Sequence, residues 1–321
     1  MSPATRIDHL PVELLRVILS TLRDSGAYQS SLKQGSLVNS RWRAVAQPLL
    51  MQDIHIDSGV AARRLIKSGM LERHQHGTVR SFRLGSITGV KTWVNHIRII
   101  LIEMTHSLHH LELVGIHGID PGWFKSASFQ SLRSLRLSSC TFDGELESGT
   151  GRLPPAADLP NLESLTVEQE NDWAYVLPPC KAPRLESLAL IHTRPNASFK
   201  FEDEELDRES DVALIQTMPE LIVIKLVLDY RWHLTKLSIE IDLAVCIIEP
   251  IIATITRHCE HLKDLHLHLH DSLFVPHSRV RFHKELLQRI VATIQQSKLQ
   301  LETLCLTGWD EGSLPSISIN T

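Results

Sequence analysis

A six-residue pattern recurs along most of the chain, with apolar residues at its first, fourth and sixth positions and mostly polar residues between them. Its consensus is Leu-x-x-Leu-x-Leu. We find eight copies, which begin at Val79, Leu108, Leu132, Leu162, Leu185, Leu221, Leu262 and Leu301. Because side chains alternate between the two faces of a strand, each copy predicts one short strand whose last two apolar residues point into a core.

Segments with a helical period lie between the strands. They run from Ala61 to Leu71, Trp93 to Met104, Leu243 to Thr256 and Glu285 to Ile294. A strand, a turn, a helix and another strand make the unit of a solenoid, in which each repeat packs on its neighbours. We therefore predict an α/β fold for residues 51–321: a curved parallel sheet of about eight repeats with helices on its convex side. Ile54 and Ile56 predict an additional opening strand.

The residue between the last two apolar positions of each copy should project from the concave face. In chain order these residues are Arg83, Glu112, Arg136, Thr166, Ala189, Lys225, His266 and Cys305. Solenoids leave this face free over a long distance, so it is the candidate binding surface. All of these residues except Ala189 are our candidate contacts to a target.

The first fifty residues have a different, helical pattern. Pro11 suits the start of a helix, and Glu13 suits its first turn. An apolar stripe then follows on this helix, formed by Leu14, Leu15, Ile18, Leu19 and Leu22. A second helix should carry Leu37 and Val38, and a third should pass through Trp42. About 40 residues rarely bury a sufficient core alone, so some of this apolar surface is expected to face a partner or the next domain. No flexible linker is expected near residue 50.

These N-terminal residues resemble an F-box. The resemblance rests on the Leu10-Pro11 pair, the apolar stripe of the first helix, the Leu37-Val38 pair and Trp42. The chain departs from the usual pattern in a longer connection before Leu32, in Gly35 where an apolar residue is usual, and in Asn39 where Cys is common. The following repeats are similar to the irregular leucine-rich-repeat-like domains of fungal-type F-box proteins. The two domains would be residues 1–50 and 51–321.

The resemblance implies a substrate-recognition subunit of an SCF-type ubiquitin ligase. In F-boxes the matching positions divide between the module's own core and the face that binds a Skp-type adaptor, which connects to a cullin-RING ligase. Carried over, these positions are Leu10, Pro11, Leu14, Ile18, Leu19, Leu37, Val38 and Trp42. The solenoid would then bind an unidentified target protein. The alternative is a non-catalytic repeat scaffold that does not engage a cullin ligase.

Composition narrows the choice of partners and compartment. The chain has 321 residues, of which 43% are hydrophobic and 22% charged, so it can bury a large core. A net charge of −4 gives no general attraction to nucleic acid or to anionic membranes. The N-terminal sequence does not have the pattern of a signal peptide, and no apolar run is long enough to span a bilayer. Five scattered cysteines suit a reducing compartment, so we expect a cytoplasmic or nuclear protein.

A histidine-rich segment has three possible roles. His266, His268 and His270 alternate along one predicted strand, and His258, Cys259 and His261 precede them. They could hold a metal, form a protonation-sensitive part of the binding face, or simply face water. Metal ligation would need other strands or loops to contribute, because side chains two apart on a strand lie roughly 6.5 Å apart. We therefore assign no metal site, and a metal-binding enzyme built on 258–270 is a distant alternative.

No established catalytic motif occurs in the sequence. We find no G-x-G-x-x-G, Walker loop, G-x-S-x-G elbow, H-E-x-x-H or paired C-x-x-C. The acidic segment 202–211 and the Pro- and Gly-bearing segment 143–160 favour solvated loops. We accordingly predict no catalytic residues, no cofactor and no enzymatic activity.

Overall fold

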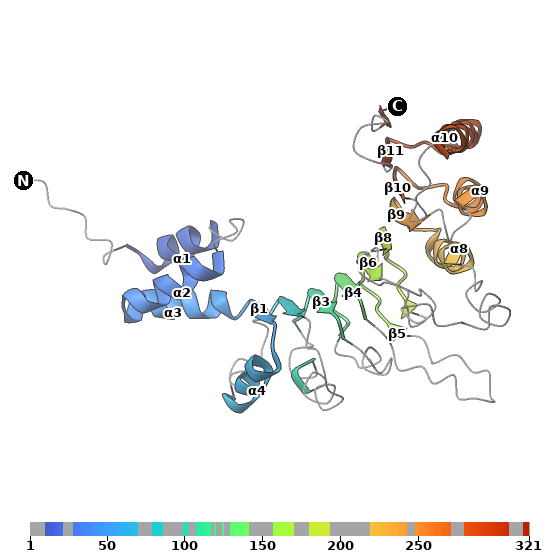
Figure 1. Cartoon of the computed structure of the whole chain (residues 1–321). Coiled ribbons are helices and arrows are strands. Elements are labelled where there is room, and N and C mark those ends of the chain that lie inside the picture. Colours follow the sequence, from blue (N-terminus) through green and yellow to red (C-terminus); the bar gives the residue numbers. More distant parts are fainter. Residues whose placement is uncertain are drawn as a thin grey trace, which may run out of the picture.

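A ten-stranded curved sheet with three helices at one end dominates the computed structural model of the protein (Figure 1). The structure describes residues 10–21, 28–69, 79–85, 99–101, 107–116, 119, 124, 129–140, 157–169, 180–192, 219–242, 248–270, 279–307 and 317–320.

The strands follow one another across the sheet in chain order. They are β1 (Asp53–Ile56), β2 (Ser81–Leu84), β3 (His110–Val114), β4 (Ser134–Ser138), β6 (Ser164–Gln169), β8 (Ser187–His192), β9 (Lys236–Asp242), β10 (Asp264–His270), β11 (Thr303–Thr307) and β12 (Ile317–Asn320). All neighbours pair in parallel except β12, which lies antiparallel on β11. Two short strands, β5 (Ala157–Asp158) and β7 (Cys180–Lys181), pair separately. The predicted curved parallel sheet is therefore present.

The apolar positions of the repeats form the core of this sheet. In β3, for example, Leu111 and Leu113 are buried, whereas Glu112 between them is partly exposed. Pairing aligns the repeats without slippage, so the outward residues form one row across the sheet. In spatial order the concave row is His55, Arg83, Glu112, Arg136, Thr166, Ala189, Ser238, His266 and Cys305.

One predicted strand was wrong. The segment that begins at Leu221 lies in helix α8 (Pro219–Tyr230), and the strand of that repeat is β9. The copy beginning at Leu234 has the same spacing, and from Lys236 to Asp242 it alternates strictly between polar and apolar residues, as in a strand with one face exposed to solvent. The segment 221–224 instead has four apolar residues in succession, which is not the pattern of a strand with one exposed face. Lys225 therefore lies in a helix. Ser238 occupies the position in the concave row that was predicted for Lys225.

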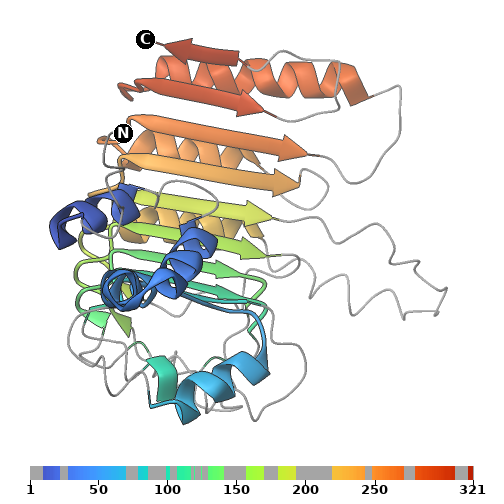
Figure 2. The same cartoon turned by 90° about the vertical axis from the view of Figure 1, so that its left-hand side faces the viewer.

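Helices cover the convex side of the sheet, as Figures 1 and 2 show. They are α4 (Gly59–Lys67), α8, α9 (Ile248–His258) and α10 (Arg279–Gln296). Three of the predicted helical segments thus overlap observed helices, and α10 is longer than expected. Of the segment 243–256, the structure describes 248–256, which are helical. Of the fourth segment, 93–104, the structure describes 99–101, which are helical. Neighbouring helices α8, α9 and α10 pack on one another in chain order.

The N-terminal residues form the expected three helices, here called the helical module: α1 (Val12–Thr21), α2 (Tyr28–Val38) and α3 (Ser40–Leu50). The carbonyl of Pro11 accepts the first helical hydrogen bond, from Leu15 at 3.0 Å. Asn39 caps α3, because its side chain accepts from the backbone N–H of Trp42 at 2.9 Å. Asn39 therefore has a structural role at the start of α3.

The core of the helical module is separate from that of the sheet. Its buried members are Leu15, Leu19, Leu32, Val45, Ala46 and Leu49. Met51 and Gln52 alone lie between α3 and β1. The carbonyl of Gln52 accepts from the N–H groups of Arg80 and Ser81 at 2.8 and 2.9 Å, which ties this junction to β2. The helical module thus joins the sheet without an extended linker.

Gly35 offers a test of the packing between the helices. A Cβ at this helical position would lie 3.5 Å from Cε3 of Trp42 and 3.7 Å from Cδ2 of Leu19, which are ordinary contacts. We expect Gly35→Ala to raise the free energy of unfolding of the module by about 0.5–1 kcal/mol, because glycine is a poor helix former. Urea unfolding, with hydrogen exchange in α1–α3 as the local readout, measures this. The matched control is Gly115→Ala, which should destabilise because Gly115 has a φ of 64°; a loss of stability in Gly35→Ala would contradict the described packing.

Candidate functional site

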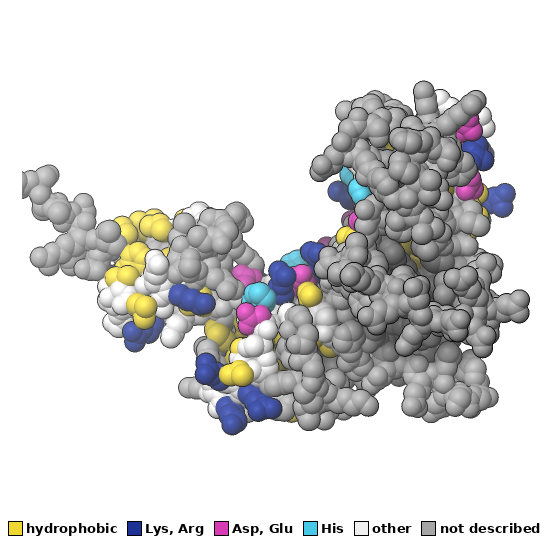
Figure 3. Space-filling view, viewed as in Figure 1, with side chains coloured by type: hydrophobic (Ala, Val, Ile, Leu, Met, Phe, Trp, Pro, Cys, Tyr) yellow, Lys and Arg dark blue, Asp and Glu magenta, His cyan; other side chains and the backbone are white. Residues whose placement is uncertain are grey.

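Five large apolar side chains of the helical module point to solvent. Their exposed fractions are 49% for Leu14, 56% for Val17, 42% for Ile18, 75% for Leu37 and 57% for Val38. The first three lie on α1 and the last two at the end of α2. Figure 3 shows hydrophobic side chains on the outer side of the module, away from the sheet. Because exposed apolar patches mark interaction surfaces, this set, here called the apolar face, is the first candidate site.

The positions carried over from the F-box resemblance divide between core and surface. Leu19 is buried, and Leu10 and Trp42 pack partly buried on the module's core. The exposed members are Pro11, Leu14, Ile18, Leu37 and Val38. Val17 was not predicted, although its place three residues after Leu14 sets it on the same face of α1.

A ladder of ion pairs lies near the start of the concave row. Nε of Arg83 lies 3.5 Å from Oε2 of Glu112, whose Oε1 lies 3.7 Å from Nε of Arg136. Arg136 also donates from Nη2 to Oε2 of Glu168 at 2.9 Å. That hydrogen bond, with the charges of both glutamates, raises the pKa of the Arg136 guanidinium, against a smaller opposing effect of burial. Three of the predicted target contacts are therefore paired with one another.

Further ion pairs bridge neighbouring repeats in the same manner. Arg133 meets Glu163 at 3.5 Å. Lys236 of β9 meets Asp264 of β10 at 3.7 Å. Lys263 and Glu302 lie 2.7 Å apart just before β10 and β11, and this contact raises the pKa of Lys263. Many of the described charges on the concave side, and at the rim where the strands begin, are thus paired with a charge of the neighbouring repeat.

Small and neutral side chains occupy the middle of the concave row. Thr166, Ala189 and Ser238 lie there, where the arc turns in Figure 1. Beyond them His266 is the register partner of Cys305. Nδ1 of His268 lies 2.8 Å from the hydroxyl of Thr307 on the next strand.

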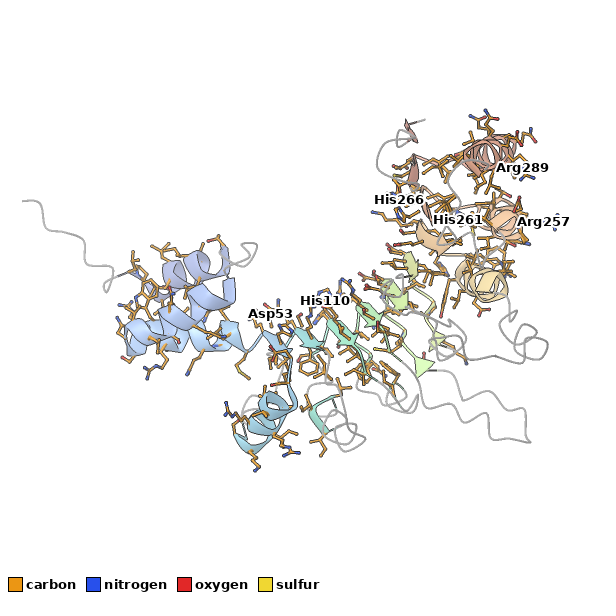
Figure 4. The ribbon with its side chains drawn as sticks, in the orientation of Figure 1. Asp53, His110, Arg257, His261, His266 and Arg289 are labelled. Carbon is orange, nitrogen blue, oxygen red and sulfur yellow. The ribbon has the colours of Figure 1, made fainter. Side chains whose placement is uncertain are left out.

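The histidine-rich segment does not converge on one point within the described residues. His258 ends α9, His261 lies in the following turn, and His266 lies on the concave side of β10 (Figure 4). Within the part of the chain that the structure describes, no three histidine, cysteine or acidic side chains are placed to hold a metal. The metal-enzyme alternative therefore has no geometric support among these residues.

The cysteines of the described region differ in access. Cys140 and Cys259 are buried, and desolvation raises the pKa of each thiol to about 11. Cys305 is partly exposed on the concave row. Since the thiolate is the reactive form, the two buried thiols should be inert.

A pocket that the sequence did not predict lies beside the turns that precede β9, β10 and β11. It has a volume of about 440 Å³ and is lined by Trp232, His233, Thr235, Glu260, His261, Leu262, Lys263 and Gln300. Trp232 lies outside every periodic pattern, so neither helix nor strand spacing could identify it. The polar residues on either side of it, Arg231 and His233, are the signal in the sequence that Trp232 is exposed.

Two predicted loops, 143–160 and 202–211, fall outside the described residues except for 157–160. None of the helices in the described part of the chain combines the length and the hydropathy needed to cross a bilayer.

The ion-pair ladder can be tested at its centre. Glu112→Gln removes the shared carboxylate, which leaves Arg83 without this partner and Arg136 with Glu168. We expect the free energy of unfolding to fall by less than about 1 kcal/mol, because partly exposed ion pairs are weak, and the difference to shrink at about 1 M salt. Urea unfolding at two salt concentrations measures both. Glu186→Gln is the control, since Glu186 forms no ion pair among the described residues; a salt-insensitive loss of several kcal/mol would refute the surface-ladder description.

Thiol labelling tests the predicted access to the sheet. Treatment of the native protein with iodoacetamide at pH 8, followed by peptide mass spectrometry, should modify Cys305 at least about tenfold faster than Cys140 or Cys259. A thiol with a pKa of about 11 is roughly one part in a thousand thiolate at pH 8, and burial further limits access. Equal rates in the folded protein would contradict the burial of the two thiols, and equal rates in urea are the expected control.

Comparison with known proteins adds no relative to this picture. No protein-family model matches the chain, and no curated protein matches it.

Proposed function

We propose that the protein is the target-binding subunit of an SCF-type ubiquitin ligase. In this proposal the helical module docks to a Skp-type adaptor, and the curved sheet holds a target protein. The observation that carries the proposal is the apolar face, because a three-helix module with its own core leaves five large apolar side chains in water. Burying one such side chain fully is worth about 1.5–3 kcal/mol, so a partner that covers the face gains substantial binding energy.

The F-box resemblance gives this partner its identity. The exposed residues Leu14, Ile18, Leu37 and Val38 are among those carried over from the adaptor-binding pattern, whereas Leu19 serves the core. A division of these positions between core and surface is what the resemblance implies. The adaptor would connect the protein to a cullin-RING ligase in the cytoplasm or nucleus.

The proposed mechanism is positional, and the protein itself would carry out no chemistry. Tethering a target beside a ubiquitin-loaded enzyme raises its effective concentration and fixes its orientation. The short connection through Met51 and Gln52 supports such a role, because the hydrogen bonds from Arg80 and Ser81 tie it to the sheet. A repeat scaffold without a cullin ligase would share the sheet but would have no use for the adaptor.

Adaptor capture with matched surface variants tests the proposal. The double variant Leu37→Gln and Val38→Gln removes apolar area from the end of α2 without adding charge. We expect it to weaken binding to a purified Skp-type adaptor by about 30-fold or more, the loss that corresponds to about 2 kcal/mol at an interface hot spot. Titration calorimetry with the intact protein gives the affinity.

Val60→Gln is the control, because Val60 on α4 is 59% exposed, nearly the same as Val38, but lies outside the apolar face. It should bind the adaptor within about twofold of the wild type. Unchanged binding by the double variant would show that the adaptor uses another surface. A folded wild-type protein that does not bind the adaptor would favour the freestanding scaffold.

A further inference from the structure

The pocket beside Trp232 lies at the rim of the sheet where the strands begin. Its walls come from the turns before three successive strands, β9, β10 and β11. Figure 2 shows the helical module on this same side of the sheet, where the strands start. Figure 4 places His261, one of the lining residues, in the turn between α9 and β10. The pocket is an open depression of about 440 Å³.

Trp232 is an exposed aromatic side chain that is held in place. It is 62% exposed, and among the described residues no other aromatic side chain is exposed to this degree. The guanidinium of Arg231 lies 4.8 Å from the centre of its ring. Arg231 also donates from Nη1 to the carbonyl of Leu228 at 2.7 Å. These contacts restrict the side chains of Arg231 and Trp232, and tryptophan is enriched at interface hot spots.

The charges around the pocket cancel. Glu260 and Lys263 line it, Lys263 pairs with Glu302 at 2.7 Å, and Arg231 covers the indole from outside the pocket. These two positive and two negative side chains carry no net formal charge. Gln300 and Thr235 add hydrogen-bonding groups to the wall. The pocket therefore suits an uncharged occupant that has one flat apolar group and several amide groups.

We propose that this pocket binds an uncharged peptide segment of the target protein, with the ring of a phenylalanine, tyrosine, tryptophan or proline packed on Trp232. The amide groups of the segment pair with the polar wall. This inference rests on the proposed function, because it names the kind of segment that the target-binding subunit receives. It also moves recognition from the concave row, where Arg83, Glu112 and Arg136 pair with one another, to the rim.

An array of blocked hexapeptides tests the proposal. All peptides are uncharged except for one variable position, which carries each of the twenty amino acids in turn. We expect the intact wild-type protein to prefer peptides with a ring at that position, and Trp232→Ala to bind them at least about tenfold more weakly. Trp232→Phe should retain the preference, because it keeps a ring, and Val60→Ala should behave as the wild type.

Three results would overturn the proposal: no binding of any peptide by the folded wild type, a preference for charged peptides, or equal binding by Trp232→Ala. Adaptor capture is measured in parallel. It distinguishes a failure of the peptide-binding proposal from a failure of the proposed function. Trp232→Ala should bind the adaptor normally, and the Leu37→Gln and Val38→Gln variant should bind the peptides normally. Loss of peptide binding with intact adaptor capture in the wild type would refute the pocket alone.

Discussion

The stacking of apolar side chains between neighbouring parallel strands is the constraint on which the rest of the structure depends. A single repeat cannot bury its own two inward residues, so each strand needs the next one to complete its core. Register then has no freedom, because a slip of one residue would turn residues such as Leu111 and Leu113 to water. The same register puts the outward residues in one row, so the composition of the concave face is a direct consequence of how the core packs.

The sheet has two edges, and different elements adjoin them. At one end the helical module follows directly into β1. At the other end β12 pairs antiparallel with β11 and satisfies the backbone groups of that edge. The strand β12 thus protects a terminal repeat that has a neighbouring parallel strand on one side alone. At the first end, the helical module has its own core and also carries the apolar face.

Alignment of the outward residues explains why charged side chains on the concave face pair with one another. Neighbouring strands lie about 4.8 Å apart, so opposite charges at the same register position can meet. The Arg83, Glu112 and Arg136 ladder arises in this way. Such pairs reach sideways to their neighbours rather than towards a partner. Recognition of a target by charge is therefore disfavoured along this row. An exposed aromatic side chain at the rim, such as Trp232, is the better candidate for a contact to the target.

The sequence was sufficient for features that depend on local alternation and insufficient for those that depend on how elements face one another. Strict alternation located β2, β3 and β10. The segment after Leu221 has the spacing of the repeat but lacks this alternation, and it forms a helix. Leu14 and Leu15 both fit the apolar stripe of α1, yet one is exposed and the other buried. This difference in exposure depends on which side of α1 faces α3, and the spacing of apolar residues along α1 does not determine that orientation. Trp232 has no periodic neighbour at all, and its exposure follows from the turn that ends α8.

The connection between the helical module and the sheet gives the proposed mechanism its physical condition. A tether works best when its length and stiffness match the distance to be spanned, and a stiff connection concentrates the target in one place. Here two residues separate α3 from β1, and the carbonyl of Gln52 is engaged by both Arg80 and Ser81. Because these bonds belong to the first pairing of the parallel sheet, bending at the junction would break contacts between β1 and β2. The position of a bound target relative to the apolar face is thus set by the same strand pairing that builds the core.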